Sequence, residues 1–147
     1  MMKNEMKVRF TAIKDNESFA RLCVASFIAN SNPTIEELGD IKTAISEAVT
    51  NSIVHAYPNN IGEVEVYVKV FNGEIYITVT DFGIGIENIE QAKQPFFTSK
   101  PDMERSGMGF TVMEGFMDSL SVESKKNNGV KITMTKKLGD YSIAVGG

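Results

Sequence analysis

The chain contains segments in which polar and apolar side chains alternate, the period-two pattern that is typical of half-buried β-strands. Two pairs of these segments are joined by turn signals, since Asn72-Gly73 separates one pair and Asn127-Asn128-Gly129 separates the other. We therefore expect two antiparallel hairpins and, ahead of them, one strand at a sheet edge. The alternating segments are residues 7–12, 63–70, 74–80, 119–124 and 130–135.

Apolar residues at helical spacing predict two helices between the edge strand and the first hairpin. The first is expected over about residues 17–29, with Asp15 or Asn16 as its cap. The second begins at Thr34, where Glu37 completes a capping-box pattern, and it continues to about His55. The expected apolar positions of the first helix are Phe19, Leu22, Cys23, Ser26 and Phe27, and the expected buried stripe of the second is Ile41, Ile45, Ala48, Val49, Ser52 and Ala56.

The pattern weakens between the two hairpins. Residues 87–105 show at most a short helix over 89–92, and a loop of that length inside a small domain is usually functional or disordered. The segment Ser106-Gly107-Met108-Gly109 then opens a third helix with Phe110 as its first apolar position. Free backbone N–H groups at such a helix start suit a phosphate group.

Composition and charge narrow the class of protein. A chain of 147 residues with 42% hydrophobic side chains suits one domain, which we expect over residues 1–137 with a flexible tail over 138–147. The net charge of -4 gives no reason to expect a nucleic-acid surface. A single cysteine, Cys23, and a start without an apolar signal segment predict a cytoplasmic protein, and no apolar run is long enough to cross a membrane.

The candidate chemistry begins with Glu47 and Asn51 on the second helix. Residues four apart share one face of a helix, so this carboxylate and this carboxamide point the same way. They flank the predicted buried stripe and therefore border the core while facing a cleft or solvent. His55 lies one turn further, and we interpret it as a helix-end residue because no second histidine or cysteine cluster accompanies it.

Two glycine-rich turns indicate a nucleotide site. The first, Asp81-Phe82-Gly83-Ile84-Gly85-Ile86, follows a predicted strand, and the second is Gly107-Met108-Gly109. Alternate glycines let a backbone turn tightly and approach a ligand closely. The dinucleotide motif lacks its third glycine and no P-loop sequence is present, so the chain is neither a Rossmann domain nor a P-loop protein.

The order of these motifs resembles the N, G1 and G2 boxes of the GHKL ATPase and kinase superfamily. Three segments, residues 46–51, 95–101 and 104–110, are similar to the anti-sigma serine kinases of spore-forming bacteria, and the resemblance extends from Asn16 to about Lys136. It implies an α+β fold, a two-layer α/β sandwich of the Bergerat type, with a mixed, mostly antiparallel sheet and the helices on one face. One departure is Val130, which stands where the family often has threonine.

The resemblance also implies a role for each matching residue. Asn51 would give its side-chain oxygen to Mg²⁺, Asp81 would accept a hydrogen bond from adenine, and Glu47 would be the catalytic base. Arg21 and Arg105 would contact protein partners. The remaining positions expected to contact ATP are Gly83, Gly85, Ile86, Thr98, Ser99, Lys100, Arg105, Ser106, Gly107, Met108, Gly109 and Phe110.

The function implied by the resemblance is a homodimeric anti-sigma factor that is also a protein serine/threonine kinase. It would bind a sporulation sigma factor of the sigma F type and use Mg²⁺ and ATP to phosphorylate an anti-anti-sigma factor on serine. Two alternatives remain open, a nucleotide-dependent sigma-binding module without turnover and the related stress-response kinase. The catalytic domain of a histidine kinase is not expected, because no dimerisation helix with a phosphoacceptor histidine precedes the domain and His55 lies inside the helix expected to bind ATP.

Overall fold

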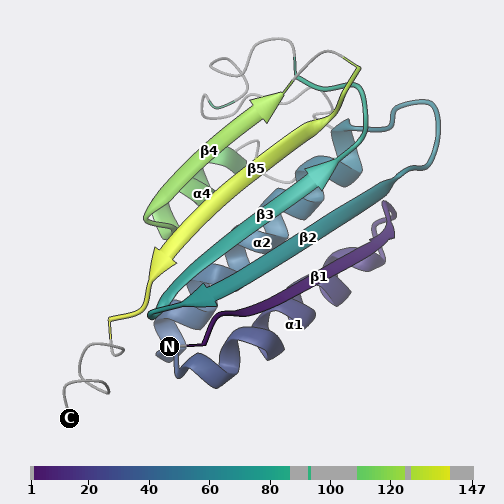
Figure 1. Cartoon of the computed structure of the whole chain (residues 1–147). Helices are drawn as coiled ribbons and strands as arrows, with labels where there is room; N and C mark the ends of the chain where they lie inside the picture. Colours follow the sequence, from purple (N-terminus) through teal and green to yellow (C-terminus); the bar gives the residue numbers. More distant parts are fainter. Residues whose placement is uncertain (1, 87–92, 94–108, 125–126, 140–147) are drawn as a thin grey trace.

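The computed structural model describes residues 2–86, 93, 109–124 and 127–139, which form one sheet and one layer of helices (Figure 1). Within this part of the chain, no helix has the length and apolar character that a bilayer crossing requires. The elements are β1 (Asn4–Thr11), α1 (Asn16–Ile28), the 3₁₀ turn η1 (Ala29–Ser31), α2 (Ile35–His55), β2 (Glu63–Phe71), β3 (Glu74–Asp81), α4 (Gly109–Phe116), β4 (Ser119–Ser124) and β5 (Val130–Lys137).

The five described strands form a sheet in the order β1-β2-β3-β5-β4, and every pairing between them is antiparallel. Both predicted hairpins are confirmed, and β1 is an edge strand as expected. Asn72 (φ 52°) and Gly73 (φ 75°) adopt the left-handed conformation that a tight hairpin turn requires. The hairpins join where β3 pairs with β5, and Asp81 at the end of β3 lies opposite Val130.

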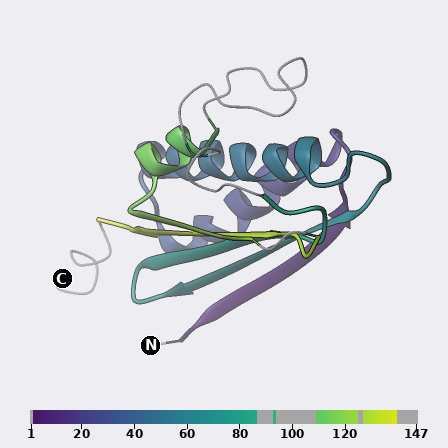
Figure 2. The ribbon, with the colours of Figure 1, turned by 90° about the horizontal axis from the view of Figure 1, so that it is seen from above.

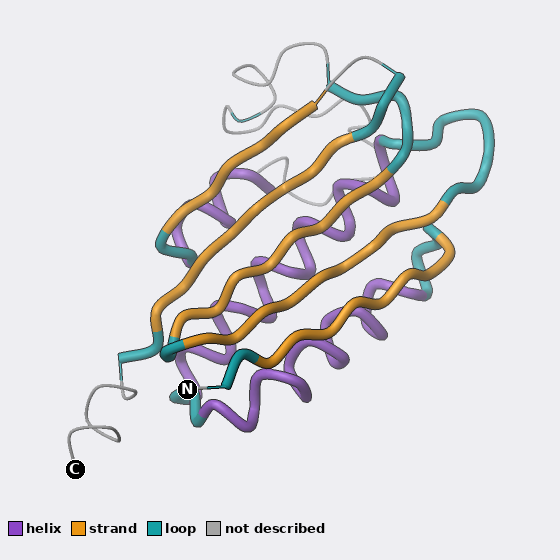
Figure 3. The backbone as a smooth tube through the Cα atoms, in the orientation of Figure 1, coloured by secondary structure: helices purple, strands orange, loops and turns teal. Residues whose placement is uncertain are grey.

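The helices cover one face of the sheet, so the fold is the two-layer α+β sandwich expected from the sequence (Figure 2). In Figure 3 the helices lie behind the strands along most of the sheet. The core fills the space between the two layers. Its fully buried strand residues alternate along β2, β3 and β5 and are Val64, Val66, Val68, Ile75, Ile77, Val79, Ile132 and Met134.

The long helix α2 follows the prediction closely. The Thr34 side chain accepts a hydrogen bond from the Glu37 N–H (3.0 Å), and the Glu37 side chain accepts one from the Thr34 N–H (2.8 Å), so the capping box is present. Every residue of the predicted stripe is buried. A single apolar face and a strong start signal therefore fix both the position and the rotation of this helix.

The predicted apolar face of α1 is wrong in part, although Phe27 packs against the core as predicted. The residues that pack into the core are Ala20, Val24 and Ile28, whereas Phe19 is 48% exposed and Leu22 is 59% exposed. This helix carries apolar residues on two faces, and the face that is buried is the one with Ala20, Val24 and Ile28. The expected Asp15 cap makes no side-chain hydrogen bond to the helix.

The folded unit extends past the predicted boundary at residue 137. Leu138 is 1% exposed and its N–H donates to the Gly73 carbonyl (2.9 Å). The next N–H, that of Gly139, donates to Glu37 Oε2 (2.8 Å). Both residues therefore belong to the domain, and residues 140–147 lie outside the described part of the chain.

The short helix α4 packs beside α2 and is held at its C-terminal end. Phe110 and Met113 are buried in the core, and Lys136 Nζ donates to the Phe116 carbonyl (2.7 Å). The same ammonium lies 3.6 Å from Asp40 Oδ2 on α2. A partly buried cation thus ties the end of α4 to the first half of α2.

Candidate functional site

Glu47 and Asn51 lie on one face of α2 and are half-buried, as predicted from their spacing. Each is followed by a buried residue, Ala48 after Glu47 and Ser52 after Asn51. Both polar side chains therefore sit where the core ends and the surface begins.

The start of α4 lies close to Glu47. A Cβ placed on Gly109 would be 3.3 Å from Glu47 Oε2, which is tighter than ordinary contact. A glycine at the first position of α4 therefore lets the helix start come near the carboxylate. The second glycine turn and Glu47, which are distant in the sequence, therefore lie close together at Gly109.

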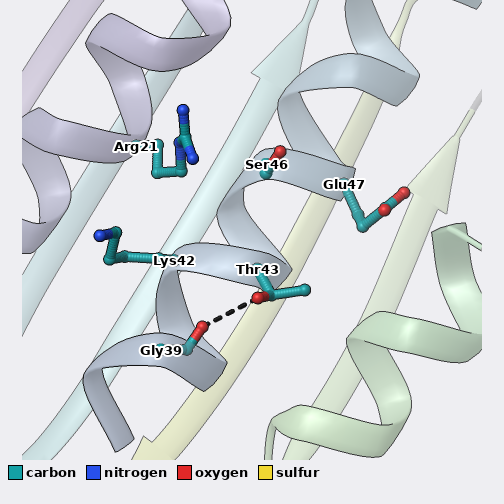
Figure 4. Close-up of a pocket in the computed structure, with 6 residues that line it drawn as sticks. All are labelled: Arg21, Gly39, Lys42, Thr43, Ser46 and Glu47. Atoms are coloured by element: carbon teal, nitrogen blue, oxygen red, sulfur yellow. Dashed lines mark hydrogen bonds between the residues drawn. The ribbon is translucent and has the colours of Figure 1, made fainter. Parts of the chain in front are cut away.

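A groove of about 300 Å³ runs over the outer face of α2 (Figure 4). Arg21 and Lys42 lie on its α1 side, and Glu47 points the other way, toward α4. Arg21 Nε is 3.3 Å from Glu17 Oε2, and the arginine side chain is 39% exposed. The residues that line the groove are Arg21, Gly39, Lys42, Thr43, Ser46 and Glu47.

Asp81 is almost completely buried, at 2% exposure. Its Oδ1 accepts hydrogen bonds from the N–H groups of Gly83 (3.1 Å) and Val130 (3.2 Å). Burial raises the pKa of the Asp81 carboxyl, and these two N–H groups together with the nearby Ser52 hydroxyl counter part of the rise. Both backbone donors meet Oδ1, so among the described residues no backbone N–H group meets Oδ2.

The glycine turn after Asp81 is packed against the end of α2. A Cβ on Gly83 would lie 2.1 Å from the Ala56 carbonyl oxygen, and the Ile84 N–H donates to that same oxygen (3.0 Å). Gly85 has φ 81°, which few other residues adopt. The Ile86 N–H donates to Ser124 Oγ (2.6 Å). The turn is thus fixed to α2 on one side and to β4 on the other.

Tyr57 also holds this turn, and the sequence analysis did not identify it. Its hydroxyl donates to the Glu63 carbonyl (2.7 Å) and accepts from the Phe82 N–H (2.8 Å). A Cβ on Gly62 would lie 2.1 Å from the Tyr57 ring, so a glycine is needed beside it. No local pattern marks a tyrosine after a helix as a bridge between two strands.

The other predicted site residues lie outside the described part of the chain. They are Thr98, Ser99, Lys100, Arg105, Ser106, Gly107 and Met108. Among the described residues, no three His, Cys, Asp or Glu side chains are grouped to hold a metal ion. Asn51 offers a single neutral oxygen, which suits a Mg²⁺ ion that arrives already bound to phosphate oxygens. Asn51, Asp81 and the close-packed glycine turn together fit a metal-bound nucleotide.

The chain is similar to proteins of known families over almost its whole length. A family model described as histidine kinase-like ATPase domain matches residues 10–136. A protein of Clostridium perfringens named anti-sigma F factor is 58% identical over 138 residues, 93% of this chain and 99% of that protein. Proteins of the same name from Clostridium acetobutylicum (56% identical, 93% and 96% covered) and Bacillus licheniformis (54%, 93% and 94%) are also similar.

Solved structures share the fold. The RsbU and RsbW domains of a Mycobacterium tuberculosis protein give a TM-score of 0.69 at 18% identity, over 92% of this chain and 32% of that one. The catalytic domain of the histidine kinase ThkA gives a TM-score of 0.57 at 17% identity, over 94% of this chain and 99% of that one. At these identities the likeness concerns the fold alone.

Proposed function

Because this chain belongs to the histidine kinase-like ATPase domain family and, within it, to the anti-sigma F factors, we propose that it is an anti-sigma factor and an ATP-dependent protein serine kinase. It would bind a sporulation sigma factor and phosphorylate an anti-anti-sigma factor on serine. The observation that carries the proposal is the geometry along α2. The buried carboxylate of Asp81, which suits an adenine ring, lies beyond the C-terminal end of α2. The half-buried carboxylate of Glu47, which lines the groove, lies nearer the middle of the helix.

In this proposal Asp81 holds the adenine. Its Oδ2 accepts from the 6-amino group, while Gly83, Gly85 and Ile86 let the backbone follow the base closely. A carboxylate in a dry site makes a stronger and more selective contact than one in water. The protein would therefore select an adenine nucleotide through a contact that burial strengthens.

Asn51 would hold Mg²⁺ through its side-chain oxygen, and the ion would neutralise charge on the phosphates. The segment from Lys100 to Gly109 would bind the phosphates, as the sequence predicts. Lys100 and Arg105 would neutralise phosphate charge, and Gly107, Met108 and Gly109 would donate backbone N–H groups. Phe110 is buried at the start of α4 and would anchor this segment in the core.

Glu47 is proposed as the catalytic base. Its carboxylate accepts the proton of the incoming serine hydroxyl as that oxygen attacks the terminal phosphorus of ATP, and ADP leaves. Glu47 lines the groove of about 300 Å³ on α2, and in this proposal the segment that carries the serine enters there. Accessibility of Glu47 from the groove is what favours a protein acceptor.

Arg21 is proposed as a contact to partners, since it lines the groove together with Lys42 and gives it two cations on the α1 side. Arg105 would be a second contact. The family further suggests a cytoplasmic homodimer that engages the sigma factor. An acidic segment on the partner matches the charge of the groove.

The decisive experiment is phosphate transfer from labelled ATP. The protein is incubated with Mg²⁺, labelled ATP and a candidate anti-anti-sigma factor, and the labelled residue is identified by mass spectrometry. Label on a serine of the added protein is expected. Label on histidine, or no transfer despite nucleotide binding, would contradict the kinase proposal, and the second result would leave a sigma-binding module without turnover.

A further inference from the structure

The ammonium group of Lys136 lies between the C-terminal end of α4 and α2. On β5 this residue continues the alternation of Ile132 and Met134, so its stem extends toward the helix layer, and its side chain is only 13% exposed. Its Nζ donates to the Phe116 carbonyl oxygen (2.7 Å) and lies 3.6 Å from Asp40 Oδ2. A lysine is seldom this buried unless its charge is paired, and Lys136 is paired with groups on two different helices.

The cation separates two groups that would otherwise repel each other. Phe116 is the last residue of α4, and the free carbonyl groups at the end of a helix carry partial negative charge. The Asp40 carboxylate carries a full negative charge and is 23% exposed, so water screens it only in part. Without the ammonium group, the end of α4 would face this carboxylate directly. Lys136 therefore holds the C-terminal end of α4 against α2.

The other end of α4 is the end that lies close to Glu47. Gly109 is its first residue, and an added Cβ there would be 3.3 Å from Glu47 Oε2. Asp40 and Glu47 are seven residues apart, which is two turns along one face of α2. Gly109 and Phe116 are separated by the same number of residues, so α4 runs antiparallel to α2 with a contact to it at each end. At eight residues, or about 12 Å, α4 is short enough that a shift of one end moves the other.

The chain that follows α4 is bound to β5. The Asp118 N–H donates to the Thr135 carbonyl (2.8 Å), and Asp118 Oδ2 accepts from the Lys137 N–H (2.7 Å). Both bonds join this chain to the sheet, and neither reaches α2. Lys136, on the same strand, contacts both helices, so it relates the end of α4 to α2.

We propose that Lys136 is a positioning residue for phosphate transfer, because it sets where the start of α4 lies relative to Glu47. The inference rests on the proposed function, in which Glu47 accepts the proton of the serine hydroxyl. Lys136 touches neither the nucleotide nor the serine in this mechanism, and it acts only through α4. Displacement of a group by about 1 Å can lower a rate on the order of 10²-fold. A small tilt of α4 is therefore enough to slow transfer.

Lys136→Met tests the proposal, because it keeps the apolar stem and removes the charge. With labelled ATP at a saturating concentration, kcat for transfer to the anti-anti-sigma factor should fall by about 10–100-fold. KM for that protein should stay at the wild-type value, because the groove on the α1 side of α2 is unchanged. Lys131→Met is the matched control, since this lysine is exposed on the opposite face of β5.

Two further variants separate positioning from stability. Lys136→Arg keeps a cation within reach of both groups, so it should transfer phosphate at close to the wild-type rate. Asp40→Asn, added to Lys136→Met, removes the carboxylate that the end of α4 would face, so the double variant should transfer faster than Lys136→Met alone. All rates are measured well below the lowest melting temperature of the set.

A wild-type kcat in folded Lys136→Met, or an equal loss in Lys136→Arg and Lys136→Met, would overturn the positioning role. A double variant no faster than Lys136→Met would overturn the repulsion on which that role is based. If Lys136→Met does not fold, the double variant should fold and transfer more slowly than wild type, and a wild-type kcat in it overturns the proposal. A wild-type protein that transfers no phosphate would instead refute the proposed function, and with it this inference.

Discussion

The two ends of the functional part of α2 differ in how far they are closed to solvent. At the closed end, defined by Ser52, Ala56 and Asp81, the exposures are 1%, 4% and 2%. At the open end, Thr43 and Glu47 line a groove of about 300 Å³. One helix thus presents a dry surface at one place and an accessible one at another.

In the proposed function, this difference separates two tasks. A small, flat base is recognised best by fixed polar groups in a site without water, because each hydrogen bond there is worth more. A hydroxyl on another protein must instead reach the carboxylate from outside, which requires the opening beside Glu47. If this division holds, substitutions at the closed end should alter nucleotide affinity, and those at the open end should alter transfer.

Glu47→Gln should have the largest effect and should act on transfer alone. Loss of a general base lowers the rate by about 10²–10⁴-fold. ADP affinity should be unchanged because the closed end is intact. Transfer is measured with labelled ATP and binding by calorimetry, with the exposed Glu36→Gln on the same helix as control. Transfer at the wild-type rate would remove Glu47 from the mechanism.

Asp81→Asn should have the next largest effect and should weaken the binding of ADP. Loss of the charged acceptor should weaken ADP binding by about 1.5–3 kcal/mol, the range for a hydrogen bond to a charged group. ADP binding to wild type should also weaken on acidification, starting at a higher pH than an ordinary carboxyl would give, because burial raises the pKa of Asp81 from 3.8. The Asn variant should lack that pH dependence in calorimetry over the same range.

The raised pKa of Asp81 also determines how the stability of the nucleotide-free protein changes with pH. Between the ordinary pKa and the raised one, the folded state holds a proton that the unfolded state has lost, so this group's contribution to stability falls as pH rises. Asp81→Asn, which can still accept from Gly83 and Val130, should therefore be more stable than wild type near neutral pH. Lower stability of the variant in urea unfolding would show that the charge is compensated in the free protein.

Gly83→Ala should destabilise the protein, because the added methyl group disturbs the packing of the glycine turn against the end of α2. The new Cβ would overlap the Ala56 carbonyl oxygen, and overpacking of this kind costs about 1–3 kcal/mol. Gly115→Ala on α4 is the matched control, since a Cβ there meets nothing within 4 Å and should stabilise the helix by about 0.5–1 kcal/mol. Equal urea midpoints for the two variants would contradict the close packing of the turn on α2.

Thr34→Ala should have the smallest effect and should leave both ends intact. It removes the side-chain cap of α2 and should cost about 1 kcal/mol of stability. Nucleotide affinity and transfer should be unchanged below the melting temperature, because the cap lies at the far end of α2 from Asp81. A change in ADP affinity would mean that the site depends on the helix start.

The sequence predicts the burial of a helix correctly where its apolar residues lie on one face. It does not predict which face is buried where apolar residues lie on two faces. The helix α2 has a capping box and one apolar face, so its position, its stripe and the placement of Glu47 all follow. The helix α1 has apolar residues on two faces, and its packing depends on the space that α2 leaves. The face with Ala20 and Val24 is buried, whereas Phe19 and Leu22 are exposed, and apolar spacing alone does not distinguish these two faces.

The site is predictable only as far as it is local. Asp81 and Gly83 are recognisable from their spacing, and Gly109 is recognisable as the start of a helix. The hydrogen bond between the Phe82 N–H and the Tyr57 hydroxyl joins segments distant in the chain, although the other partner of that hydroxyl, Glu63, is only six residues away.

The opposition of Asp81 and Val130 in the ladder between β3 and β5 has a consequence for the lifetime of the protein. Each hairpin forms from neighbouring residues, but β3 and β5 meet across a long stretch of chain, and such non-local pairing is slow to form. The carboxyl is oriented by Val130 only once the two hairpins have joined. A nucleotide that needs this arrangement binds the assembled sheet alone and stabilises it by mass action, so it should also protect the chain from proteases that act on partly opened molecules.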